Sequence, residues 1–130
     1  MLSGLSPNTL YYYQIRSRDV ALNLGTATGQ FSTQTDTVAL VISAVAATNV
    51  ASTTATITWA TNEPATSKVY YALSFPVNTA SSPFVSMPAL ILSHSIALTS
   101  LNASTTYYYS VESQDASGNT AWVLPSKFLL

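Results

Sequence analysis

His94 is the only histidine of the chain, and the residue types that accompany a catalytic histidine are also present. Ser93, Ser95 and Asp115 complete the composition of a Ser–His–Asp triad, in which an acid orients the histidine and the histidine activates a hydroxyl. No nucleophile-elbow or oxyanion-loop motif accompanies them. His94 also shares the inward parity of Ile96 in an alternating stretch. We therefore interpret His94 as a strand-edge residue that caps a core, and we expect no catalytic residues and no enzyme activity.

Three oxygen-bearing side chains, those of Glu112, Asp115 and Asn119, are of the types that ligate calcium. Three ligands from one hairpin are too few, and the EF-hand spacing is missing. Asp and Asn at these positions more simply serve a turn. The absence of Cys excludes a thiolate zinc site, and a single His excludes the usual multi-His sites. We expect no metal site and no cofactor.

Alternating apolar and polar residues predict the strands that would position these side chains. The predicted strands are an opening strand at 40–45, alternating stretches at 55–59, 68–71, 94–98 and 107–112, and a closing strand at 122–129. Asn62-Glu63-Pro64 is the predicted turn between the first two alternating stretches, and Gly118-Asn119 is a predicted hairpin turn with positive φ. No stretch has convincing helical periodicity. The spacing predicts an all-β sandwich of about seven strands.

The chain contains an internal repeat with a constant offset of 96 residues. Residues 5–19 align with residues 101–115, and each segment holds a run of three tyrosines. Asn23 aligns with Asn119 at the same offset, and Phe31 aligns with Phe128 one residue later. Tandem modules of this length explain the repeat. We therefore expect residues 1–36 to be the C-terminal part of one module and residues 37–130 to be a nearly complete module.

Three segments of the second module resemble the fibronectin type III domain. Residues 55–59 resemble strand B with its buried Trp59, and residues 61–71 resemble the B–C turn and strand C of many bacterial members. These residues are also similar to the N-terminal sandwich domain of purple acid phosphatases. Residues 94–101, followed by Thr105-Thr106-Tyr107, resemble strand E and the tyrosine corner that opens strand F. The resemblance implies an all-β, immunoglobulin-like β-sandwich, with one complete module preceded by approximately strands E, F and G of another.

The same resemblance assigns structural roles to five tyrosines. Tyr11 and Tyr107 would be corner tyrosines, whose hydroxyls bond to backbone upstream in the chain. Tyr13, Tyr71 and Tyr109 would fill the core. The metal ligands of the phosphatases belong to a separate catalytic domain, so the resemblance brings none of them into this chain.

Tyr70 and Tyr108 have outward parity, and they lie on strands C and F, which are neighbours in the fibronectin type III fold. The two rings are expected to form an exposed aromatic pair, and Tyr12 has the same outward position in the first module. Exposed aromatics can stack on sugars or anchor a protein contact. The alternative is ordinary cross-strand pairing that stabilises an exposed sheet. Tyr12, Tyr70 and Tyr108 are therefore the candidate binding residues.

The partial first module presents an apolar face with no second sheet to cover it. The face consists of Tyr11, Tyr13, Ile15 and Phe31. Such a face is unstable in water, and open strand edges favour pairing. The chain is then an excerpt of a longer tandem protein, or a neighbouring copy completes the half-module by strand exchange, or the half-module packs on the complete one. We favour the first two explanations, so these four residues are candidates for self-assembly.

Composition limits the partners of the chain. Only 7% of its 130 residues are charged and the net charge is −1, which leaves no basic surface for nucleic acid. The longest apolar run, residues 38–47, is about half the length of a membrane-spanning helix, so no membrane insertion is expected. Nineteen Ser and 18 Thr supply solubility through hydroxyls, as in many secreted β-proteins. Asn102-Ala103-Ser104 also fits the acceptor pattern for N-glycosylation, which one sequon in such a chain meets by chance.

These observations together predict a non-catalytic structural module of an extracellular or cell-surface repeat protein. It would act as a spacer, or as a subunit that assembles with other copies or adjacent modules. One alternative is a module that binds carbohydrate or protein through Tyr70 and Tyr108, and another is an accessory domain of a secreted hydrolase such as a metallophosphatase. No signal peptide is visible in residues 1–7, so we expect a fragment or a processed segment.

Overall fold

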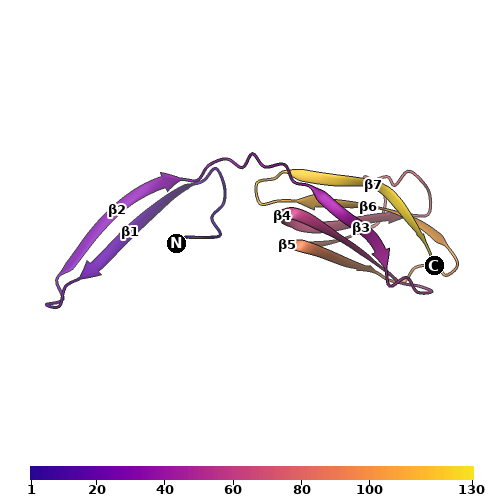
Figure 1. The fold of residues 1–130 in the computed structure, drawn as a ribbon, viewed down its shortest axis with the longest axis horizontal. Helices are drawn as coiled ribbons and strands as arrows, with labels where there is room; N and C mark the ends of the chain where they lie inside the picture. The colour runs from indigo at the N-terminus through magenta and orange to yellow at the C-terminus, as the bar shows by residue number, and fades with distance from the viewer. The chain divides into compact units, whose positions relative to one another are not determined.

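The computed structural model describes residues 1–130, except for the side chain of Pro125. The chain divides into two compact units, Met1–Val38 and Ala39–Leu130, which Figure 1 shows in indigo to violet and in magenta to yellow. All of the regular secondary structure in the described residues is β-strand. A helix long and apolar enough to cross a membrane is absent from the part of the chain so described.

The first unit is a single antiparallel hairpin of β1 (Leu10–Arg18) and β2 (Leu24–Ser32). The side chain of Asp19 organises the loop that joins them. Its Oδ1 accepts the backbone N–H groups of Ala21 and Asn23, each at 2.9 Å, and its Oδ2 accepts the side-chain amide of Asn23 at 2.9 Å. The hydrogen bonds from Asn23 and Ala21 lower the pKa of Asp19 below its usual 3.8. The loop therefore has a built-in acceptor for its own backbone.

The first unit contains two strands, whereas we expected approximately three, E, F and G. Residues 1–9 form no strand. The repeat explains this correction. At the offset of 96, Met1 and Leu2 align with the last two residues of β5 (Phe84–Leu98), so residues 1–9 contain no more than the end of a counterpart to that strand. Only the counterparts of the last two strands of the second unit are present.

The second unit has five strands, two of which are long enough to take part in both layers of a sandwich. The strands are β3 (Ile42–Thr48), β4 (Ala55–Ala72), β5 (Phe84–Leu98), β6 (Thr106–Gln114) and β7 (Thr120–Leu129). The N-terminal half of β4 pairs with β3 and with the C-terminal half of β5. The C-terminal half of β4 pairs with the N-terminal half of β5 and with β6, which pairs with β7. All of these pairs are antiparallel, and Figure 1 shows the resulting sandwich.

The turn predicted at Asn62-Glu63-Pro64 is not formed as a break between strands. β4 continues through these residues, and its register with β5 shifts between Ala60 and Ala65 instead. The Asn62 side chain fixes this bend, because its Oδ1 accepts the N–H of Val41 at 2.7 Å and its amide donates to the carbonyl of Ala39 at 3.0 Å. A bulged irregularity can thus redirect one long strand where the sequence indicates two. The hairpin turn at Gly118 is confirmed, with φ of +91°.

The core lies between the two layers of the second unit and follows the predicted alternation. Ala55, Ile57 and Trp59 are each at most 3% exposed. They pack with residues of every other core-forming segment: Val69, Ile96, Leu98, Leu101, Tyr107, Tyr109, Val111 and Phe128. The one polar atom of the Trp59 ring is satisfied, because its Nε1–H donates to Ser113 Oγ at 2.9 Å. Burial of each large apolar side chain contributes about 2 kcal/mol to this fold.

Candidate binding surface

Three aromatic rings form a row on the outer face of the second unit. On β4, Val69 points into the core, so Tyr70 points outward. Tyr70 lies opposite Phe84 of β5, and their ring centroids are 5.5 Å apart at an angle of 54°. On the other side, the Tyr70 ring stacks with Trp122 of β7, with centroids 6.1 Å apart and planes at 16°. We call Phe84, Tyr70 and Trp122 the aromatic platform.

An ion pair accompanies the aromatic platform. Lys68 and Glu112 are cross-strand partners on β4 and β6, and the Lys68 Nζ lies 3.2 Å from Glu112 Oε1. The Tyr70 hydroxyl donates to Glu112 Oε2 at 2.9 Å and accepts from Lys68 Nζ at 3.3 Å. Burial alone lowers the pKa of Lys68, but its bonds to Glu112 and Tyr70 outweigh burial and raise that pKa above 10.5. Lys68 is therefore charged at neutral pH, and as an ion pair with Glu112 it adds no net charge to this face.

The exposed rings of this face differ from those that we predicted. Tyr70 has the predicted outward parity but is only 7% exposed. The prediction of an exposed Tyr70 is wrong because Phe84, Trp122 and Lys68 lie against its ring. Phe84 and Trp122, at 55% and 52% exposure, carry the accessible aromatic surface instead. Sequence reasoning missed both, although the outward parity of Trp122 next to the inward Val123 was readable.

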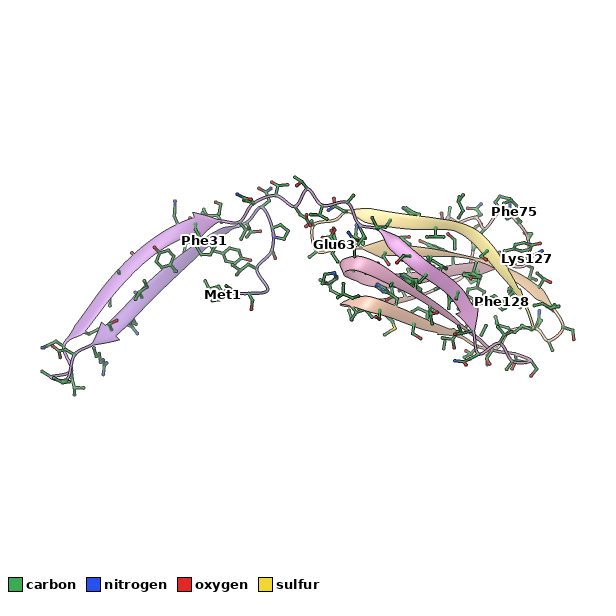
Figure 2. All side chains as sticks on the ribbon, viewed as in Figure 1. Met1, Phe31, Glu63, Phe75, Lys127 and Phe128 are labelled. Atoms are coloured by element: carbon green, nitrogen blue, oxygen red, sulfur yellow. The ribbon has the colours of Figure 1, made fainter. Side chains whose placement is uncertain are left out.

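Tyr108 lies on the same outer face as Tyr70 but does not form the predicted pair with it. The register places Tyr70 opposite Ser110 and Tyr108 opposite Ala72, so the two tyrosines are diagonal neighbours. The half-buried Tyr108 ring packs instead against Phe75, with centroids 6.0 Å apart. Figure 2 shows Phe75 in the loop that follows β4. Phe75 is 65% exposed and extends the aromatic surface beyond the strands.

The first unit carries exposed aromatic and aliphatic side chains on both faces of its hairpin. Tyr12, the counterpart of Tyr108, is 76% exposed. On the opposite face, Tyr13 and Ile15 are 43% and 56% exposed. Tyr11 and Phe31 are half-buried through their mutual stacking at 5.8 Å, and Phe31 is labelled on β2 in Figure 2.

The corner tyrosines of the two units make the same hydrogen bond. The hydroxyl of Tyr107 accepts the backbone N–H of Asn102 at 3.1 Å, and that of Tyr11 accepts the N–H of Ser6 at 2.8 Å. In both cases the partner lies five residues upstream. The prediction that both hydroxyls bond upstream backbone is confirmed. The repeat is therefore one of three-dimensional structure as well as of sequence.

His94 is a core residue, and the hydrogen-bond partners of its ring are not the serines and the aspartate of the candidate triad. It is 2% exposed and stacks on Trp59, with centroids 4.9 Å apart and planes at 4°. Its Nε2 lies 2.9 Å from Thr61 Oγ1 and its Nδ1 lies 2.7 Å from Ser67 Oγ. Thr61 donates its own proton to the carbonyl of Glu63, so Nε2–H is the donor to Thr61 and Ser67 donates to Nδ1. Burial lowers the pKa of this neutral imidazole below 6.5.

Asp115 serves its turn, as predicted. Its Oδ1 accepts the N–H groups of Ser117 at 2.8 Å and Asn119 at 2.9 Å, and its Oδ2 accepts the Asn119 amide at 2.8 Å. Asp19 makes the equivalent bonds in the first unit. The carboxylate of Glu112, the third of the candidate calcium ligands, accepts hydrogen bonds from Lys68 and Tyr70.

The strand arrangement, the buried Trp59 and the corner Tyr107 define a fibronectin type III-like sandwich. A crystal structure of the FN1–FN3 domains of chicken CNTN1, a contactin, aligns with a TM-score of 0.55 and 14% identity, which shows the fold alone. The alignment covers 97% of this chain and 44% of that chain. The family described as purple acid phosphatase, N-terminal domain, matches residues 42–128, and the chain belongs to that family. No curated protein matches. The chain is therefore a non-catalytic, fibronectin type III-like module.

Proposed function

We propose that this chain is a structural spacer in a tandem array of fibronectin type III-like modules on an extracellular or cell-surface protein. The observation that carries the proposal is the repeated geometry at the offset of 96 residues. The corner bonds of Tyr11 and Tyr107 and the Asp-centred turns of Asp19 and Asp115 recur in both units. A repeated unit with the same internal bonds is typical of an array whose members each fold around their own core.

The exposure of the first unit supports the same proposal. Tyr13 and Ile15 are exposed, whereas their counterparts Tyr109 and Val111 are 3% and 0% exposed. In the second unit, Tyr109 and Val111 belong to one core cluster with residues of β4 and β5, and residues of β3 pack against that cluster. The first hairpin thus carries the apolar side chains of two strands whose inner face would pack on a second layer. In a tandem array, that layer is supplied by the earlier strands of the same module.

Completing the first module tests the proposal directly. In a fusion that places residues 39–98 before residue 3, the repeat supplies the missing strands in register. We expect the backbone amides of Tyr13 and Ile15 to gain protection from hydrogen exchange, approaching that of Tyr109 and Val111. A matched control fuses the same residues with Ile57 and Trp59 of the added copy both changed to Ser, which removes the covering apolar face. The proposal fails if the fusion leaves the protection of Tyr13 and Ile15 unchanged.

Self-assembly through the candidates Tyr11, Tyr13, Ile15 and Phe31 is the competing form of the structural role. Strand exchange would cover these residues with a second copy of the chain. Sedimentation of residues 1–130 over a hundredfold range of concentration separates the two forms. If the chain is a spacer, contacts of this face do not make its mass in solution increase with concentration. Ile15→Ser then leaves that mass unchanged. A dimer or polymer that Ile15→Ser dissociates would support strand exchange instead.

The family match favours an accessory role as a second candidate. The match over residues 42–128 is to a domain named for its place at the N-terminus of purple acid phosphatases. We propose as the alternative that the module accompanies a hydrolase domain that carries the catalytic metal ligands. Sequencing the gene on both sides of this chain decides the matter. A neighbouring domain with metal-ligand motifs supports the accessory role, whereas further modules alone exclude it.

A further inference from the structure

Beyond a structural role, we propose that the aromatic platform of the second unit is a binding site for a neutral polysaccharide. Phe84 and Trp122 would contact the sugar rings, and Lys68 and Glu112 would bond the sugar hydroxyls. The inference is based on the outer face of one unit, so it holds whether that unit is a spacer or an accessory domain.

The platform presents rigid aromatic surface to solvent. Phe84 and Trp122 are more than half exposed, while Tyr70 lies between them at 7% exposure. Tyr70 contacts both rings, and its own hydroxyl is fixed by Glu112 at 2.9 Å. Rings held in this way lose little conformational freedom when a ligand binds. The surface therefore suits a ligand that has apolar faces of its own.

The ion pair adds hydrogen-bonding groups without adding net charge. The Lys68 ammonium has three protons, and its acceptors among the described residues, Glu112 Oε1 and the Tyr70 hydroxyl, use two of them. Each oxygen of the Glu112 carboxylate also keeps acceptor capacity after its bond to Lys68 or Tyr70. The side chains of Lys68 and Glu112 are 30% and 14% exposed, so a ligand reaches them at the surface.

This chemistry favours neutral hydroxyls over charged groups. A hydroxyl both donates and accepts, so neighbouring hydroxyls can bond the ammonium and the carboxylate at the same time. A charged ligand would be attracted by one member of the pair and repelled by the other, so it would gain little net electrostatic attraction. A protein partner that buried the pair would have to remove both charges from water, which offsets much of the gain from the rings.

The arrangement of the rings favours an extended ligand. The row runs from β5 over β4 to β7, with centroid separations of 5.5 and 6.1 Å. The ring centroids of Phe84 and Trp122 are therefore at most about 12 Å apart, and β6 lies between β4 and β7 along the row. A small molecule that is bound by burial requires a concave pocket, whereas sugar rings joined in a chain can contact successive aromatics on an open surface.

Affinity electrophoresis of the full chain in native gels tests the proposal. The gels contain hydroxyethyl cellulose, galactomannan or soluble starch as neutral polymers, or alginate as an anionic polymer. We expect at least one neutral polymer to retard the wild-type chain. Trp122→Ala and Phe84→Ala should each lower its affinity about tenfold. Leu24→Ala is the matched control, because Leu24 is an exposed apolar side chain on the other unit at 47% exposure, and it should bind like the wild type. Urea midpoints establish that all variants are folded.

Four results from the gels would overturn the proposal. They are no retardation by any neutral polymer, retardation by alginate alone, unchanged affinity in both platform variants, and a loss in Leu24→Ala as large as that in Trp122→Ala. A concentration-dependent dimer that Trp122→Ala dissociates would also overturn it, because the face would then belong to a second copy of the chain. Retention by a neutral polymer that is lost only in the platform variants supports it.

Discussion

At the scale of single residues, His94 couples the stability of the second unit to pH. Its pKa in the folded state is below 6.5 because the ring is buried, so the folded state resists protonation while the unfolded chain accepts the proton at its usual pKa. The full contribution is therefore present above about pH 6.5 and is lost as pH falls toward the lower folded pKa. The contacts found for the ring, Trp59, Thr61 and Ser67, do not titrate in this window.

We expect the urea midpoint of the second unit to fall between pH 7.5 and pH 5. Tryptophan fluorescence reports this transition, because both tryptophans, Trp59 and Trp122, lie in the second unit. His94→Gln should lower stability at all pH values but remove the slope in this interval, since Gln does not titrate. An equal slope in His94→Gln would assign the pH dependence to another group.

The corner tyrosines allow a test in which one atom is removed. Tyr107→Phe deletes the hydroxyl that accepts the N–H of Asn102, so we expect a loss of about 1 kcal/mol in the free energy of unfolding. Tyr108→Phe deletes a hydroxyl on the outward neighbour and should change stability by less than about 0.5 kcal/mol. Urea titration at pH 7.5 compares the two. Equal losses would contradict the special role of the corner hydroxyl.

The sequence predicted which side chains point inward and which point outward. It did not predict which outward side chains are covered by their neighbours. Alternation placed Ile57 and Trp59 inward and Tyr70 outward, and the structure agrees. Parity does not say which outward residues are covered, because this depends on cross-strand register. The bulged register of β4 with β5 brings Phe84 opposite Tyr70, and that bulge left no clear signal in the sequence. The predicted exposed pair of tyrosines failed for this reason.

At the scale of elements, β1–β2 and β6–β7 are two hairpins of related sequence in different surroundings. The first has Tyr13 and Ile15 exposed, and the second has Tyr109 and Val111 buried under a second layer. An isolated two-stranded hairpin is at best marginally stable in water. We expect the amides of β1 to exchange at least a hundredfold faster than those of β6 in the same sample, as measured by NMR. Similar protection of both strands would show that the first hairpin is covered in solution.

At the scale of the whole molecule, the repeat revealed more than the composition did. Length and composition alone fitted one plain domain, whereas the offset of 96 residues predicted a partial and a complete module. The route of β4 and β5 through both layers was not predictable, since local alternation reads the same on either side of a bulge. Which outer face binds a partner also depends on register, so Phe84 and Trp122 emerged only from the structure.

The second unit is expected to fold without the first. All residues of its core cluster lie between Ala55 and Phe128, so removing residues 1–38 takes nothing from that cluster. The free energy of unfolding of residues 39–130 should therefore match that of the second unit in the full chain within about 0.5 kcal/mol. As a contrast, ending the chain after residue 119 removes β7 and its Phe128, which stacks on Tyr107 at 5.9 Å, and should abolish the cooperative transition. A loss of more than about 1 kcal/mol on deleting residues 1–38 would mean that the units stabilise each other, and the array would then behave as coupled repeats instead of independent spacers.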